Sequence, residues 1–193
     1  MEEIILKNIA YNYYPKNICN IKNLQEYSSS IEFKRLINIV NSFNDDFMLN
    51  DFKILFSELK KEELFKNIKD NSSFNSDRCL TLNIEFLENN DRLINININI
   101  SLLIPYYFIY IVENQIKLNP YKWITIPKRN KLLEKEKYNN QINTISKLIE
   151  KMLNFRKFPE NLLSIIIKDL SFQDNSFGNF TFFNAFFHDN NIQ

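Results

Sequence analysis

The chain has 193 residues, of which 45% are hydrophobic and 15% aromatic, and its formal net charge is +1. This length supports a core without disulfides or metals, and this much apolar surface excludes wholesale disorder. The near-zero charge gives no bulk attraction to nucleic acid or to an anionic membrane. Asn, Ile, Lys, Phe and Tyr share AT-rich codons, so we attribute their abundance to an AT-rich genome and not to function.

The first third of the chain predicts one strand and two helices. Residues 2–10 are predicted as a short strand, and residues 11–15 as a turn or loop. A capping-box spacing followed by apolar residues at helical period predicts a helix near 30–43. A second helical stretch covers 50–69. Its two apolar stripes are out of phase, which predicts a break near 60–62.

The middle of the chain predicts a sheet. Apolar and polar residues alternate over 80–86 and again over 94–100, with turn residues at 89–91 between them. Further strands are predicted over 106–113 and 121–126. Together they make an antiparallel meander with one apolar face and one wet face rich in Asn. Such a face would be prone to aggregation as an open edge, so we expect something to cover it.

The last third predicts an amphipathic helix over 142–153. Residues 159–170 suit a helix and a strand equally well, and the sequence leaves this open. The segment 172–187 is dense in Phe around the single glycine, Gly178, and is expected to dock onto the body. The prediction is a single α+β domain over 1–193, with the meander packed against several helices.

The sequence lacks the motifs of several common catalytic, nucleotide-binding and metal sites. With Gly178 as the one glycine, the chain cannot form a P-loop, a Rossmann fingerprint or a nucleophile elbow. With His188 as the one histidine, it cannot form a multi-histidine metal site. The spacing of Cys19 and Cys79 fits no zinc or redox motif, and both are expected to be reduced, partly buried thiols. We therefore expect no catalytic, cofactor or metal site.

The segments that could direct the chain to a membrane are also missing. The first residues lack a basic region followed by a long apolar stretch. The longest apolar run, Leu102–Val112, is about half the length that spans a bilayer. We expect a cytoplasmic protein.

Tyrosine and tryptophan residues are the main indication of a protein-binding function, because both residue types are favoured anchors of protein interfaces. The alternative for each is a place in the core. The cluster that begins at Lys128 could contact a phosphate, although a solvated loop is the default interpretation. The predicted partner-binding residues are Tyr11, Tyr13, Tyr14, Lys16, Tyr121, Trp123, Lys128 and Arg129.

Two stretches resemble known proteins. Tyr13–Ile18, followed by Glu32, Arg35 and Leu36, resembles the start of small bacterial immunity proteins, and Gly178–Phe187 resembles their carboxyl-terminal motif. These proteins neutralise toxins of contact-dependent or type VI delivery systems. The resemblance implies a cytoplasmic, cofactor-free protein that binds a cognate toxin domain, and it identifies no binding residues.

Two other hypotheses remain open. The first is a structural or accessory protein of a phage or secretion apparatus, which would bind copies of itself or a component of the machine. The second is an enzyme whose carboxylates, Tyr and Lys form an unrecognised site. Nucleic-acid binding comes last.

Overall fold

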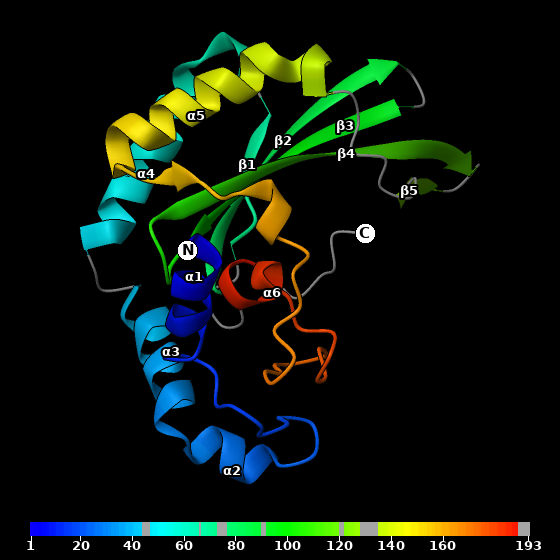
Figure 1. The fold of residues 1–193 in the computed structure, drawn as a ribbon. Coiled ribbons are helices and arrows are strands. Elements are labelled where there is room, and N and C mark those ends of the chain that lie inside the picture. Colours follow the sequence, from blue (N-terminus) through cyan, green and yellow to red (C-terminus); the bar gives the residue numbers. More distant parts are fainter. Residues whose placement is uncertain are drawn as a thin grey trace.

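The computed structural model shows an α+β protein built on one open sheet, with helices on both of its sides (Figure 1). It describes residues 1–43, 47–65, 67–72, 77–89, 92–119, 122–127 and 135–188.

The sheet is the meander that the alternating residues predict. The strands are β1 (Ile68–Asp70), β2 (Cys79–Asn89), β3 (Arg92–Ser101), β4 (Tyr106–Asn119) and β5 (Lys122–Pro127). They lie in chain order, and each neighbouring pair is antiparallel. The two-residue strand β6 (Arg156–Lys157) is an addition that the sequence did not predict. It pairs in parallel with the start of β4, so the sheet is mixed.

One face of the sheet forms a dry core with two helices. The isoleucines of β3 at 94, 96, 98 and 100 are at most 1% exposed. They belong to one apolar cluster with α4 (Phe47–Lys61) and α5 (Asn139–Leu153), which lie side by side over this face (Figure 1). The helix predicted over 142–153 is therefore confirmed, with an earlier start.

The second predicted helix ends earlier than expected. α4 stops at Lys61 and a 3-10 turn, η2 (Glu63–Phe65), follows, so the predicted break near 60–62 is confirmed. The predicted continuation to residue 69 is wrong, because β1 begins at Ile68 and pairs with β2. Phe65 and Ile68, which read as a second helical stripe, are instead buried against the dry face of the sheet.

The polar face is not the wet face that the sequence predicts. Asn83 and Asn95 are 8% exposed, and Asn99 is fully buried. At one end this face is covered by the Phe-rich segment, because Phe108 of β4 lies 6.1 Å from Phe183 and 6.3 Å from Phe187 between ring centroids. The expected cover therefore exists at this end of the sheet.

The amino-terminal segment is a helix, α1 (Glu2–Ala10), and the strand predicted over 2–10 is wrong. Glu2 and Glu3 occupy the first turn and Lys7 the last, which complements the helix dipole. Leu6 and Ala10, four residues apart, are the buried face. The apolar run at its start was misread as a strand, because a run this short does not distinguish the two periods.

The other predicted amino-terminal elements are confirmed. Residues 11–14 form turns. α3 (Ile31–Ser42) matches the helix predicted near 30–43, and a short helix, α2 (Leu24–Ser29), precedes it. The residue that caps α3 is Ser30, whose hydroxyl accepts a hydrogen bond from the Phe33 N–H.

Residues 159–170 are neither of the two predicted alternatives. They contain the short 3-10 helix η4 (Glu160–Leu162) and turns, and Ile166 forms an isolated bridge with Thr181. The following segment docks as predicted. Its short helix α6 (Phe182–Phe186) is fully buried and joins α1 in a second apolar cluster, on the side of the sheet opposite to α5.

Candidate functional site

The structure describes only some of the eight predicted partner-binding residues. Tyr121, Lys128 and Arg129 lie outside the described residues. Trp123 lies in β5, where the backbone is described and the side chain is not. The described candidates are thus Tyr11, Tyr13, Tyr14 and Lys16, all of which follow α1.

Tyr14 is a core residue, and its assignment to the partner surface is wrong. Its side chain has no exposed surface. The hydroxyl donates a hydrogen bond to the Ala185 carbonyl oxygen at 2.7 Å. Its ring makes edge contacts with Phe172 and Phe180, at centroid distances of 5.5 and 5.0 Å. Tyr14 therefore joins the turn after α1 to the docked carboxyl-terminal segment.

Tyr11 and Lys16 form a fixed pair at the surface. The Tyr11 hydroxyl lies 2.7 Å from Asp169 Oδ2 and 3.0 Å from Oδ1, and burial and this hydrogen bond raise the pKa of Tyr11. Lys16 Nζ lies 3.5 Å from the centroid of the Tyr11 ring. Lys7 lies on the same ring, and the Tyr11 hydroxyl raises its pKa. Two cations and one aromatic ring thus meet in a rigid, partly exposed cluster.

Large exposed apolar side chains are most frequent in the amino-terminal part of the described chain. Of the ten that are found among the described residues, six lie within the first 31 positions. They come from α1, α2, the turn before α2 and the start of α3, which occupy one half of the molecule (Figure 1). We call this set the amino-terminal apolar surface: Met1, Ile4, Ile5, Ile21, Leu24 and Ile31.

This surface does not follow from the prediction that residues 2–10 are a short strand. A helix over residues 2–10 predicts that Ile4 and Ile5 are exposed. With Leu6, Ile9 and Ala10 facing the body, a helix of 3.6 residues per turn directs Ile4 and Ile5 away from it. Their exposed fractions are 66% and 53%.

The titratable groups of the described residues were compared with the requirements of a metal site. No group of three or more His, Cys, Asp or Glu side chains in this part of the chain could hold a metal. His188 Nε2 lies 3.9 Å from Asp77 Oδ2. Cys19 and Cys79 are free thiols with 7% and 2% exposure.

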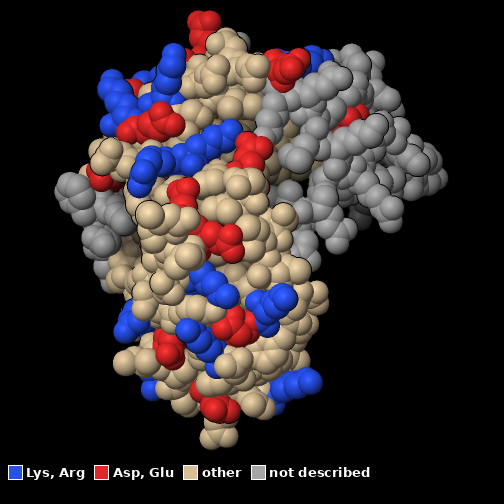
Figure 2. All heavy atoms as spheres, viewed as in Figure 1, with Lys and Arg blue, Asp and Glu red and all other residues tan. Residues whose placement is uncertain are grey.

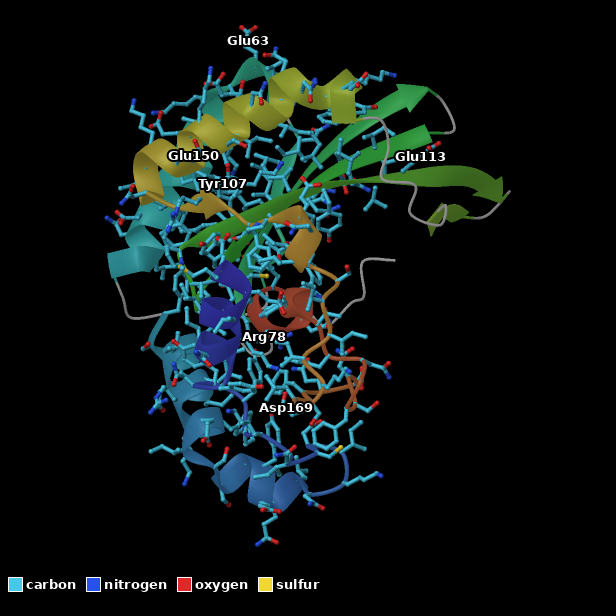
Figure 3. All side chains as sticks on the ribbon, viewed as in Figure 1. Glu63, Arg78, Tyr107, Glu113, Glu150 and Asp169 are labelled. Atoms are coloured by element: carbon cyan, nitrogen blue, oxygen red, sulfur yellow. The ribbon has the colours of Figure 1, made fainter. Side chains whose placement is uncertain are left out.

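Two tyrosines have strongly raised pKa values, and both lie within the folded sheet. Burial raises the pKa of Tyr107 to about 12, and its hydroxyl donates a hydrogen bond to Glu150 at 2.7 Å. Tyr107 and Glu150 face each other between β4 and α5, which this bond joins (Figure 3). Burial first, and Cys79 second, raise the pKa of Tyr110 to about 12, while a hydrogen bond from Asn99 opposes them.

Charged side chains of both signs share the described surface. Figure 2 shows acidic and basic side chains interspersed over the described part of one face. This agrees with the formal net charge of +1. Within the described ranges, no helix combines the length and apolar character needed to cross a bilayer.

Comparison with known proteins identifies no relative. No protein-family model matches the chain, and neither a curated protein nor a solved structure does. The class is therefore defined by the fold itself: an α+β protein with an open, mostly antiparallel sheet.

Proposed function

We propose that this chain is a non-enzymatic protein-binding domain of the immunity type, which binds a cognate toxin domain in the cytoplasm and neutralises it. The observation that carries the proposal is the amino-terminal apolar surface. Six large apolar side chains of the first 31 residues leave apolar area in water that a partner could bury.

Burial of such a surface supplies affinity. Each Å² of apolar area removed from water contributes on the order of 25 cal/mol, before the costs of association. Ile4, Ile5 and Leu24 are each more than half exposed, so a partner would gain most of their burial. The near-neutral charge favours such an interface over one based on electrostatic attraction.

An aromatic cluster directly follows α1, the helix that carries Ile4 and Ile5. Tyr11 is held by Asp169 and presents its ring together with Lys16, while Tyr13 is half-buried and packs against the apolar cluster of α1 and α6. Tyr and Lys side chains that are already held in place lose little entropy on binding. In this proposal Tyr11, Tyr13 and Lys16 flank the apolar contacts.

The test compares two matched substitutions. Ile5→Glu changes a residue of the proposed surface, and Ile166→Glu changes an equally apolar residue outside it; their exposed fractions are 53% and 46%. The proteins to be tested as partners are those encoded next to this gene, where an immunity protein's cognate toxin is expected. Affinity is measured by calorimetry, and protection is measured as growth of cells that express the toxin.

We expect Ile5→Glu to weaken binding by tenfold or more and to remove protection, because a central contact is worth roughly 2 kcal/mol. Ile166→Glu should bind as the parent does. Equal losses in both variants would contradict the proposed surface. If the protein binds copies of itself and no toxin, the proposal fails, and a structural role in a phage or secretion apparatus becomes the better explanation.

A further inference from the structure

A half-open cavity lies between α2, α3 and residues 172–173, at the end of the molecule that α2 occupies (Figure 1). Its volume is about 250 Å³. This is smaller than the roughly 300–1,000 Å³ of sites for whole drug-sized molecules. It is larger than a cavity of roughly 150 Å³, lined by Leu, Ile and Phe, that binds benzene. The cavity therefore has room for one group of the size of an aromatic ring.

Part of the cavity wall consists of aromatic rings. Tyr27, Phe33 and Phe172 all line it. Between centroids, the Tyr27 ring lies 5.4 Å from that of Phe33 and 6.3 Å from that of Phe172. The rings of Phe33 and Phe172 are 6.2 Å apart. Because aromatic rings attract one another through edge and offset contacts, beyond the burial of apolar area, this wall favours an aromatic occupant.

The helix α3 adds an aliphatic wall, and the cavity is already formed. Leu36 and Val40 of α3 line it, and both are buried. Tyr27 is held by its hydroxyl, which donates a hydrogen bond to the Ser171 carbonyl oxygen at 2.8 Å. A ring could therefore enter with little loss of side-chain entropy in the wall.

Arg78 also lines the cavity, and it already interacts within the fold. Its guanidinium carbon lies 4.7 Å from the centroid of the Phe172 ring. We therefore give its charge no role towards an occupant. The other lining residues are uncharged, and a charge buried without a partner is costly, so the cavity suits a neutral group.

The cavity shares one residue with the amino-terminal apolar surface. Leu24 lines the cavity and is 67% exposed. A protein that covers Leu24 could thus insert a side chain into the cavity at the same time. The strongest contacts of protein interfaces are typically large side chains that fill a pocket, within a rim that excludes water.

We propose that the cavity receives one aromatic side chain of the protein that binds the amino-terminal apolar surface. The ring lies against Tyr27, Phe33 and Phe172, beside the aliphatic wall of α3. The identity of that protein rests on the proposed function, whereas the preference for a neutral aromatic ring rests on the cavity alone.

The first test titrates the intact protein with three small probes and follows its backbone amide signals by NMR. N-acetyl-phenylalaninamide carries the ring on a piece of polypeptide backbone, N-acetyl-cyclohexylalaninamide carries a saturated ring, and toluene is the ring alone. We expect N-acetyl-phenylalaninamide to shift signals of α2, α3 and residues 172–173 in a saturable manner. The saturated analogue should bind about fivefold more weakly, because it lacks the aromatic contacts.

Two matched variants locate the binding. Ser28 and Ser29 are both exposed, and each hydroxyl donates a hydrogen bond to the Gln25 carbonyl oxygen. Of the two, Ser28 lines the cavity. Ser28→Trp should block the cavity and abolish binding of N-acetyl-phenylalaninamide, whereas Ser29→Trp should bind it as the parent does. These surface changes leave the core intact, so loss of folding does not obscure the result.

The same variants separate this inference from the proposed function. Ile5 does not line the cavity, so Ile5→Glu should bind N-acetyl-phenylalaninamide as the parent does. Partner binding should fall tenfold or more in Ser28→Trp and stay unchanged in Ser29→Trp. If no neighbouring protein binds, the proposed function fails, and the probes still decide whether the cavity takes a ring.

Four results would overturn the inference. The first two are no saturable binding of N-acetyl-phenylalaninamide, and equal or tighter binding of its saturated analogue. The third is tighter binding of toluene, which would assign the cavity to a free aromatic molecule. The fourth is a Ser28→Trp variant that keeps either the probe or the partner. In each case the loss of partner binding by Ile5→Glu remains a separate test of the proposed function.

Discussion

Tyr14 gives the sharpest test of how the two ends of the chain are joined. Tyr14→Phe removes the hydrogen bond to the Ala185 carbonyl oxygen and keeps the ring contacts, so it should lower the free energy of unfolding by about 1 kcal/mol. Tyr14→Ala also removes a ring with no exposed surface, which packs on Phe172 and Phe180. By analogy with buried Phe→Ala changes, we expect a loss of about 3–5 kcal/mol.

These magnitudes are measurable in urea. A domain is stable by about 5–15 kcal/mol in total, so Tyr14→Ala should shift the unfolding midpoint strongly and Tyr14→Phe slightly. The half-buried Tyr13 is the control, and Tyr13→Ala should have a smaller effect than Tyr14→Ala. A Tyr14→Ala protein with the parent's midpoint, but without partner binding, would refute the core assignment and restore Tyr14 to the interface.

Three further predictions concern buried polar groups. Asn95→Val should raise the free energy of unfolding by about 1 kcal/mol, because it removes a buried Oδ1 that accepts no hydrogen bond; Asn97→Val should lower it, because Asn97 accepts a 2.8 Å bond from the Asn83 side chain. Chemical denaturation of both variants checks the opposite signs. The pKa of Tyr110 is about 12 when folded against 10 when unfolded, so its contribution is complete below pH 10 and is lost between pH 10 and 12. Denaturation across this range should show a smaller decline in Tyr110→Phe than in the parent. Cys19 and Cys79, each under 10% exposed, should react with a thiol reagent only after unfolding; rapid reaction of the native protein would contradict their burial.

The proposed site could be predicted only in part. The sequence drew attention to the Tyr11–Asn17 turn because Tyr is a favoured interface residue, and Tyr11 and Lys16 do lie at the surface. The same reasoning included Tyr14, which is in the core, because composition does not tell on which side of a turn a ring lies. Arg78 carried no sequence signal at all. Its position against Phe172 depends on a contact between residues 94 positions apart.

The sequence by itself determined strands β2 to β5 of the sheet and helices α3, α4 and α5. Strict alternation over 94–100 and helical period over 31–42 are local patterns, and each matches one backbone geometry. Tertiary structure decided the rest. The Asn-rich face became partly buried because the Phe-rich segment docks on one end of it. Residues 159–170 form only short turns among themselves, and Ile166 pairs with the distant residue Thr181. Local periodicity reports which face of an element is apolar, whereas what covers that face depends on contacts between segments distant in the chain.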